Sequence, residues 1–285
     1  MEKIIKEKIS SLLSEEEEVL SVEQLGGMTN QNYLVKTTSK PYIVKFFGKG
    51  TEKLINRQDE KYNLELLKDL NLDVKNYLFD IESGIKVNEY IESATTLDST
   101  SIKTKFEKIA PILQTIHASG KELRGEFAPF EEIKKYEALI EGNIPYANYE
   151  AVRKDVFSLE KRLADLGVDR RPCHIDLVPE NFIESPQGRM YLIDWEYSSM
   201  NDPMWDLAAL FLESEFTNQE EENFLTYYES DKTPVSREKI RIYKILQDTI
   251  WSLWTVYKEA QGADFGDYGV SRYQRAVDGL TYYGG

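Results

Sequence analysis

The sequence predicts an α+β protein with two lobes, a small antiparallel sheet followed by a larger, mainly helical region. Residues 21–47 alternate apolar and polar side chains, and the GGMTN and TSK segments between them have the composition of turns. Beyond residue 101 apolar residues instead recur every three or four positions, which is the spacing of amphipathic helices. We therefore expect a first lobe at residues 1–91 and a second at residues 92–285.

The first lobe is expected to contain strands, one helix and then further strands. Its N-terminal segment, MEKIIKEKISSLLSEEEEVL, has helical spacing and lacks the uninterrupted apolar stretch of a signal peptide. The segments VEQL, NYLVKT and PYIVKFF have strand character, and helical spacing follows from about Asn56 to Leu72. VKNYLFD and GIKVNEYI then return to strand character, which completes a small sheet.

The second lobe is expected to consist of helices around one strand-rich segment. Apolar spacing predicts a first helix from Ile102 to Ile116, ending near Ser119. Further helical patterns cover 130–141, 148–166, 204–214, 218–229 and 236–260. Between Cys173 and Asp194, the apolar runs NFI and MYLID flank a Pro-Gln-Gly turn, which predicts a β-hairpin.

Composition argues against several classes of partner. The 285 residues carry a formal net charge of −15, which would repel phosphate backbones and anionic lipids, so we expect no nucleic-acid or membrane partner. A cationic small molecule is favoured instead. One Cys and two His are too few for an ordinary structural zinc site, and a lone Cys173 suits a reducing compartment. No segment has the roughly 20 apolar residues of a membrane span. We expect a cytoplasmic protein, of an oligomeric state that the sequence leaves open.

The most informative segment is HIDLVPEN, followed downstream by YLIDWE. Phosphoryl transfer needs a group that accepts or orients the hydroxyl proton, and oxygen ligands for magnesium. Asp176 is the candidate base, and Asn181 and Asp194 are the candidate metal ligands. The H-x-D-x-x-x-x-N spacing with a later Asp is that of the catalytic and magnesium loops of kinases. A buried histidine capping a turn is the alternative explanation of His174.

Upstream residues supply candidate contacts to the ATP phosphates. Gly26, Gly27, Thr29 and Asn30 lie between two predicted strands, in a segment similar to loops whose glycines let backbone amides approach an anion. Lys45 is a cation among apolar strand residues, where a buried lysine needs an anionic partner. A solvent-facing lysine at a strand edge is the alternative.

Glu60, on the helix after Lys45, is the expected ion-pair partner of that lysine. Glu52 and Glu65 are near enough in the sequence to compete for this position. The VNEYI segment, which contains Glu89 and Tyr90, lies where the two lobes would join. Its backbone groups are therefore candidates for binding the adenine edge of ATP.

With these motifs, the chain resembles the choline/ethanolamine kinase family, a branch of the aminoglycoside-phosphotransferase-like group, and is most similar to its bacterial choline kinases. The resemblance covers almost the whole chain. It rests on the segments GGMTNQNY, IVKFF, INRQDEKYN, LQTIHASG, CHIDLVPENF, LIDWEYSSMNDPMWDLA and IWSLWTVYKEAQGADFGDY. The IDWEYSS block and the late Trp pair are the selective segments.

The resemblance implies a two-lobed protein-kinase-like fold that uses ATP and Mg²⁺ and phosphorylates an amino alcohol at its hydroxyl. It implies that Asp176 is the base, that Asn181 and Asp194 bind the metal, and that Lys45 paired with Glu60 grips the phosphates. His117 resembles a structural position of the family, so we expect a satisfied core histidine. Asp206 is expected to hold the catalytic loop, with a role in the acceptor site as the alternative.

A quaternary ammonium has no N–H to donate, so a selective site for it must use aromatic faces and nearby carboxylates. Trp251 and Trp254 project from one face of a late predicted helix, and similar enzymes place such a pair in the choline site. Helical core packing is the alternative for this pair. Weaker candidates for the same site are Tyr197, Tyr268 and Glu213, with Glu215 as an alternative to Glu213 and a short deletion leaving the alignment of Tyr268 open.

The function expected from these residues is ATP-dependent choline kinase activity, with choline and ATP as small-molecule partners and phosphocholine and ADP as products. One alternative keeps the chemistry but uses ethanolamine, an aminoglycoside or another amino alcohol, whose N–H groups would favour carboxylates over a Trp pair. Another alternative is a binding module with the fold of a kinase but no turnover. Intact Lys45, Asp176, Asn181 and Asp194 argue against it.

Overall fold

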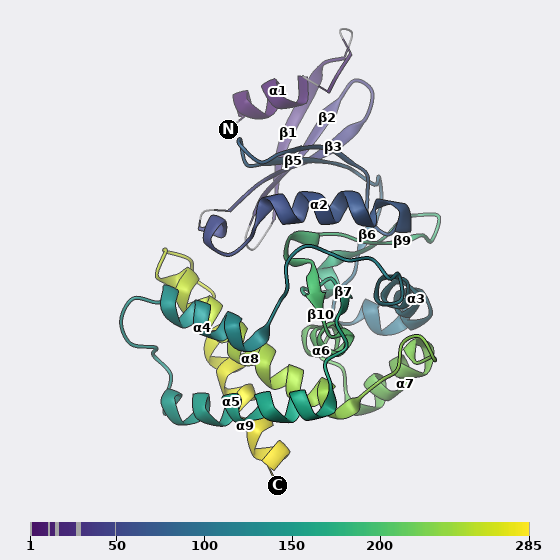
Figure 1. Ribbon diagram of the computed structural model, residues 1–285. Coiled ribbons are helices and arrows are strands. Elements are labelled where there is room, and N and C mark those ends of the chain that lie inside the picture. The colour runs from purple at the N-terminus through teal and green to yellow at the C-terminus, as the bar shows by residue number, and fades with distance from the viewer. Residues whose placement is uncertain (1, 11, 15–16, 27–29, 49, 285) are drawn as a thin grey trace. The chain divides into compact units, whose positions relative to one another are not determined.

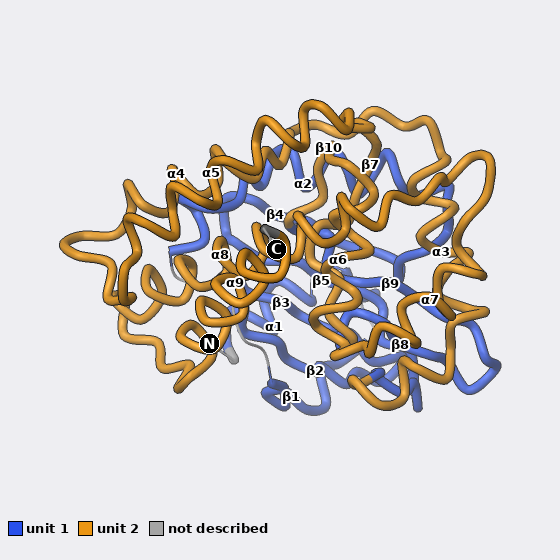
Figure 2. The backbone as a smooth tube through the Cα atoms, turned by 90° about the horizontal axis from the view of Figure 1, so that it is seen from below, with its two compact units in different colours: residues 1–97, 180–196 blue, residues 98–179, 197–285 orange. Residues whose placement is uncertain are grey.

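The computed structural model describes residues 2–10, 12–14, 17–26, 30–48 and 50–284 (Figure 1). By its internal contacts the chain forms two compact units (Figure 2). Unit 1 contains residues 1–97 and 180–196, and unit 2 contains residues 98–179 and 197–285. Unit 1 therefore extends beyond residue 91 and takes in a later segment, because residues 180–196 fold against the first part of the chain. A functional division at residue 91 stays a prediction.

Unit 1 is built on a five-stranded antiparallel sheet with the strand order β1-β2-β3-β5-β4. The strands are β1 Val19–Leu25, β2 Gln31–Thr37, β3 Pro41–Phe46, β4 Asn76–Asp80 and β5 Ile85–Glu89. In β2, β3 and β5, the apolar residues Val35, Val44 and Val87 are fully buried. The alternation predicted from the sequence thus forms a sheet with one apolar face.

The N-terminal helix α1, Glu2–Ser10, covers part of this apolar face. Ile5 and Ile9, one helical turn apart, are fully buried and pack in the same cluster as Val35 and Val44. The helical segment expected over the first twenty residues is therefore shorter, because β1 already begins at Val19 and pairs with β2.

Unit 1 also contains α2 and a second, three-stranded sheet. α2 runs along the five-stranded sheet (Figure 1). Its N-cap is Asn56, whose side chain accepts from the backbone N–H groups of Gln58 and Asp59. The second sheet has the order β6-β8-β9, in which β8 and β9 form the predicted hairpin. The bounds are η1 Thr51–Lys53, α2 Arg57–Leu67, η2 Lys68–Leu70, β6 Thr95–Thr96, η4 Pro179–Asn181, β8 Phe182–Glu184, β9 Met190–Leu192 and η5 Trp195–Tyr197.

Unit 2 is mainly helical, as predicted. Its elements are η3 Ser101–Thr104, α3 Phe106–His117, α4 Pro129–Leu139, α5 Tyr149–Leu166, β7 Arg171–Cys173, β10 Ser199–Asn201, α6 Pro203–Glu213, α7 Asn218–Tyr228, α8 Arg237–Glu259 and α9 Tyr268–Gly284. The long α8 is central, since it packs against α4, α5, α6 and α9. The sequence did not predict α9, whose FGDY segment was considered only as a source of acceptor contacts. Among the described residues no helix is long and apolar enough to cross a membrane.

Candidate active site

The hairpin of β8 and β9 brings Asn181 and Asp194 to one end of unit 1. Asn181 directly precedes β8, and Asp194 follows β9 by two residues. The backbone N–H of Ile193 donates to the carbonyl of Asn181 at 2.9 Å, which closes the open end of the hairpin. The two predicted metal ligands are therefore held next to each other along the hairpin ladder, as the sequence predicted.

The backbone before Asp176 is held in an uncommon conformation. Ile175 has a φ of 78°, which a β-branched residue rarely adopts, and it is fully buried. Its N–H donates to Oδ1 of Asp206 at 2.8 Å, and its carbonyl accepts from the Trp205 indole at 3.0 Å. Both partners lie on α6, so the start of this helix fixes the backbone that presents Asp176.

Asp206 has the structural role that the sequence suggested. Its Oδ2 accepts from the backbone N–H of His174 at 2.8 Å and lies 3.0 Å from Nε2 of His117. The other ring nitrogen of His117 lies 2.7 Å from the Tyr228 hydroxyl. His117 and Asp206 are both buried, so His117 is a satisfied core histidine that supports the carboxylate.

Lys45 on β3 is a buried cation, not a solvent-facing strand residue. Its side chain is 7% exposed, and its Nζ lies 2.5 Å from Asp194 and 3.9 Å from Glu196. Burial acts to lower the pKa of Lys45, but the two carboxylates more than offset this and raise it, so the lysine is charged. The side chain is placed to neutralise anionic groups next to Asp194.

The predicted ion pair between Lys45 and Glu60 is not formed. The Glu60 carboxylate instead accepts from Lys86 Nζ at 2.5 Å and from Arg57 at 2.6 Å. Lys86 lies directly opposite Lys45 in the register of β3 and β5, so two cations face one helix. Glu60 therefore pairs with Lys86 and Arg57. The two carboxylates beside Lys45 are those of Asp194 and Glu196.

Asn30, the residue directly before β2, belongs to this charge network. Its amide Nδ2 donates to both oxygens of Glu196, at 3.0 and 3.1 Å, and its Oδ1 accepts from the N–H of Gly48. Arg57 donates to Glu196 at 2.9 Å. Gly27 and Thr29, also predicted to contact phosphate, lie outside the described residues.

A cavity of about 320 Å³ lies within unit 1 beside Lys45 and Asp194. This volume is in the range of small-molecule sites. Gly26, Glu89 and Tyr90, three predicted ATP contacts, line it. Apolar residues such as Ile43, Ile183 and Ile193 form about half of the remaining wall, and polar or charged residues form the other half. A cavity that combines apolar wall residues with a cation and a carboxylate suits a nucleobase and its phosphates.

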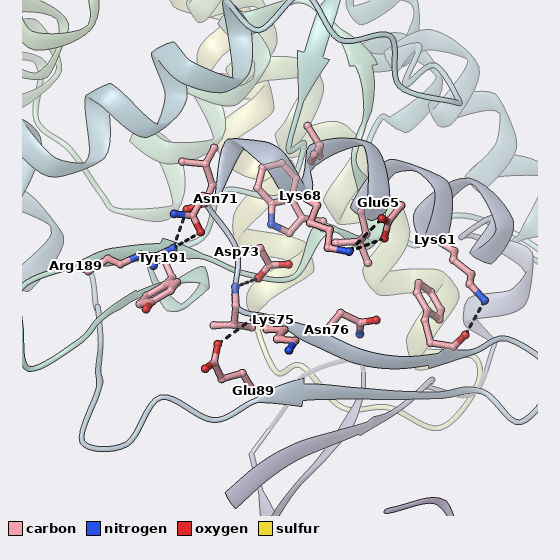
Figure 3. A pocket seen from close by; sticks show the side chains of 16 residues that line it. Lys61, Glu65, Lys68, Asn71, Asp73, Lys75, Asn76, Glu89, Arg189 and Tyr191 are labelled. Carbon is pink, nitrogen blue, oxygen red and sulfur yellow. Dashed lines mark hydrogen bonds and ion pairs between the residues drawn. The ribbon is translucent and has the colours of Figure 1, made fainter. Parts of the chain in front are cut away.

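A second cavity of about 570 Å³ adjoins the first within unit 1 (Figure 3). The two cavities share the wall residues Leu64, Asp73, Val74, Asn76 and Glu89. Burial raises the pKa of Asp73 to about 7, although Lys86 and the N–H of Val74 act to lower it. This carboxyl therefore titrates near neutral pH in a wall common to both cavities.

The predicted acceptor residues gather in unit 2. Trp251 and Trp254 are 8% and 5% exposed and meet edge to face, with ring centroids 6.5 Å apart. Tyr197 packs edge to face on Trp251 at 5.7 Å, and Phe265 lies 4.9 Å from Trp254. The Trp pair is thus buried in a cluster of aromatic side chains that also contains Tyr197 and Phe265.

Glu213 and Tyr268 are connected by a third residue, Arg272, which the sequence analysis did not identify as a site residue. Arg272 on α9 contacts the Glu213 carboxylate, and its guanidinium lies 4.7 Å from the Tyr268 ring centroid. Burial, together with the charges of Glu213 and Asp176, raises the pKa of Tyr268, so its hydroxyl stays protonated.

Several residues of the site were missed by sequence reasoning. Glu196 and Arg57 are buried members of the charge network beside Lys45, and Lys86 pairs with Glu60. For Glu196 a signal existed, since it follows Asp194 by two residues in a strongly apolar segment. For Arg57 and Lys86, nothing in the local pattern distinguishes a buried cation from a surface one.

The antiparallel sheet with its buried lysine, the hairpin with Asn181 and Asp194, and the helical second unit define a phosphotransferase of protein-kinase-like fold. The spectinomycin phosphotransferase APH(9)-Ia, 14% identical with a TM-score of 0.66 over 99% of this chain and 98% of that one, shares this fold. A family model for choline/ethanolamine kinase matches residues 22–241. The chain belongs to the choline/ethanolamine kinase family.

Close relatives support this assignment over nearly the full length. The crystal structure of choline kinase LicA from Streptococcus pneumoniae is 87% identical, with a TM-score of 0.96 over 99% of both chains. A structure of LicA in complex with AMP is 89% identical, with a TM-score of 0.93 over 99% of this chain and 98% of that one. The protein LicA of Haemophilus influenzae strain KW20 is 29% identical over 87% of this chain and 97% of its own length.

Proposed function

We propose that this phosphotransferase moves the γ-phosphoryl group of ATP to the hydroxyl of choline, giving phosphocholine and ADP. The observation that carries the proposal is the similarity over 99% of both chains to a solved choline kinase. The predicted base, metal ligands and lysine of such a reaction, Asp176, Asn181, Asp194 and Lys45, are all present in this chain. The cavity beside Lys45 and Asp194 has a volume suited to a small molecule.

In this proposal Asp176 accepts or orients the proton of the acceptor hydroxyl. The oxygens of Asn181 and Asp194 are the hard ligands that Mg²⁺ prefers, and the hairpin holds these residues side by side. When bound there, magnesium would supply charge neutralisation for the transferred phosphoryl group. Lys45, now paired with Asp194, would exchange part of that contact for the phosphates, with Glu196 keeping it in place.

The acceptor is proposed to bind in unit 2, against Trp251, Trp254 and Tyr197. Aromatic faces attract a quaternary ammonium by about 0.5–2 kcal/mol each, without any N–H donor on the ligand. Glu213 and Tyr268 would add charge and a further ring. The charge of Asp176 acts on both Tyr268 and Tyr136, so these two rings lie near the proposed base.

A coupled assay of ADP release with magnesium-ATP tests the function directly. Choline, ethanolamine and an aminoglycoside are compared as acceptors, and we expect kcat/KM to be highest for choline. ADP release with ethanolamine or the aminoglycoside alone would keep the catalytic residues and remove choline as the substrate. No release with any acceptor would favour a binding module.

Trp254→Ala tests the aromatic wall. We expect the KM for choline to rise about tenfold, since one ring of the cage is lost, while the KM for ATP stays within about twofold. Steady-state kinetics with each substrate varied in turn measure both constants. Equal increases in the two constants would mean that Trp254 acts only as part of the core.

A further inference from the structure

Arg272 is a buried arginine on α9 that joins three helices of unit 2. Its side chain is 3% exposed. One terminal nitrogen, Nη1, donates to Oδ1 of Asp248 on α8 at 3.1 Å, and the other, Nη2, contacts Oε1 of Glu213 at the end of α6. Its guanidinium also lies over the ring of Tyr268, 4.7 Å from the centroid. A single side chain thus touches both of the weaker acceptor candidates.

The two carboxylates depend on Arg272 to different degrees. Asp248 also accepts from Arg275, at 2.8 Å from Nε and 2.5 Å from Nη2, so it keeps a cationic partner without Arg272. Among the described residues, Arg272 is the cation that forms an ion pair with Glu213, whereas Arg275 acts on it only through a longer-range charge interaction. The Glu213 side chain is only 16% exposed. A largely buried carboxylate without a partner is costly and would move to reach solvent.

This arrangement leaves part of the Glu213 carboxylate available. Arg272 contacts Oε1, whereas Oε2 accepts no hydrogen bond from a described side chain. Asp248, which anchors the guanidinium, lies three residues before Trp251 on α8. The contacts of Arg272 therefore connect α9 to the helix that carries the Trp pair and to the carboxylate at the end of α6.

We propose that Arg272 is a positioning residue for the acceptor, holding the Glu213 carboxylate where it faces the cationic end of the substrate. The inference rests on the proposed choline kinase function. Arg272 itself does not bind the acceptor. Its planar fork matches two carboxylates on different helices at once, which the single ammonium of a lysine cannot do.

Arg272→Lys keeps the charge but removes the fork. We expect the KM for choline to rise about tenfold, with the KM for ATP and the kcat each within about twofold. Arg275→Lys is the matched control, because Arg275 lies on the same helix and shares Asp248 but forms no hydrogen bond or ion pair with Glu213. Lysine keeps the positive charge through which Arg275 acts on Glu213 at longer range. In this control we expect the KM for choline within about twofold of the wild type.

A comparison in the Glu213→Gln background separates positioning from general packing. If Arg272 acts through Glu213, adding Arg272→Lys to Glu213→Gln changes the KM for choline by less than about twofold. Should Arg272→Lys be too unstable to purify, Arg272→Gln with Glu213→Gln, compared with Glu213→Gln alone, makes the same comparison without an unpaired buried charge.

The outcomes separate this inference from the proposed function. Wild-type protein that transfers no phosphoryl group to choline would remove the function itself. Wild-type activity with an unchanged KM for choline in Arg272→Lys would overturn the positioning role alone. Equal effects of Arg272→Lys and Arg275→Lys, or full additivity with Glu213→Gln, would show that Arg272 only stabilises the packing of α9, and would also overturn it.

Discussion

Glu60 shows how far the role of a single residue depends on its neighbours. The motif order predicted that it would pair with Lys45, but its carboxylate is held by Lys86 and Arg57. Lys86 and Lys45 face each other across β3 and β5, so either lysine is near α2. A difference of a few ångströms decides which of the two lysines pairs with Glu60, because the energy of an ion pair falls with distance. The sequence spacing alone cannot resolve that difference.

Asp176 tests the proposed chemistry at the level of one side chain. Asp176→Ala is expected to reduce kcat by about 10² to 10⁴, the usual contribution of a general base. The backbone directly before it is held by Asp206 and Trp205, both of which the substitution leaves in place, so the thermal midpoint should stay close to that of the wild type. The coupled ADP assay and a thermal melt measure the two quantities, and a near-normal kcat would remove Asp176 from the role of base.

The raised pKa of Asp73 leads us to expect that the stability of the fold depends on pH. Its pKa in the folded state is raised to about 7, above the usual value of about 3.9 in an unfolded chain. A raised carboxyl pKa stabilises the fold below about pH 4, and this contribution is lost as the pH rises through 7. Asp73 is partly exposed, so the full shift does not translate into free energy.

Asp73→Asn should therefore increase the free energy of unfolding more at pH 8 than at pH 5, by about 1 kcal/mol. The substitution removes the cost of ionising a partly buried carboxyl near Lys86 and Asp194 while keeping its shape. Urea unfolding at the two pH values measures the difference. Asp80→Asn, at a carboxylate of the same unit whose partner is Lys8, serves as the control. A gain that is the same at both pH values would contradict the titration of Asp73.

At the scale of elements, α6 is the support of the catalytic segment. It begins with the Asp202 cap, is almost entirely buried, and contributes Trp205 and Asp206 to the backbone at Ile175. The sequence predicted this helix within one residue at each end and also the hairpin that follows the catalytic segment. The periodicity of apolar residues was sufficient to predict these elements, since each has a continuous local pattern.

Asp206→Asn tests that support. Replacing the carboxylate weakens charge-assisted hydrogen bonds to two backbone N–H groups and to His117, and each is worth about 1.5–3 kcal/mol. We expect a loss of roughly 2–4 kcal/mol in the free energy of unfolding, and a lower kcat with a nearly unchanged KM for ATP. Chemical unfolding and steady-state kinetics measure these effects. Normal kcat in a destabilised protein would show that α6 supports the fold but not the position of Asp176.

For the molecule as a whole, the net charge of −15 suits a cationic acceptor, and membership of the choline/ethanolamine kinase family agrees with that expectation. The α+β fold and the enzyme class predicted from the sequence are confirmed. The roles of the individual acceptor residues stay predictions. These roles depend on contacts between helices, and one of those helices, α9, was not predicted from the sequence.

The overall charge predicts a dependence on ionic strength. An acidic protein attracts a cation through a field that salt screens, with a Debye length that falls from about 14 Å at 50 mM to about 4 Å at 500 mM. We expect kcat/KM for choline to decrease about two- to fivefold over this range. The same measurement with ATP varied is the control, because screening should not disfavour an anion. An equal decrease for both substrates would indicate a general effect of salt on the enzyme.

The sequence by itself determined the order of the helices and strands before α9, the family, and the segment that carries Asp176, Asn181 and Asp194. These follow from local spacing, because periodicity and motif order are properties of neighbouring residues. Only the tertiary structure decided that Glu196 lies beside Lys45, and that Arg272 links Glu213 to Asp248. Charges that are distant in the sequence pair according to their separation in space, and that separation is set by the packing of whole elements.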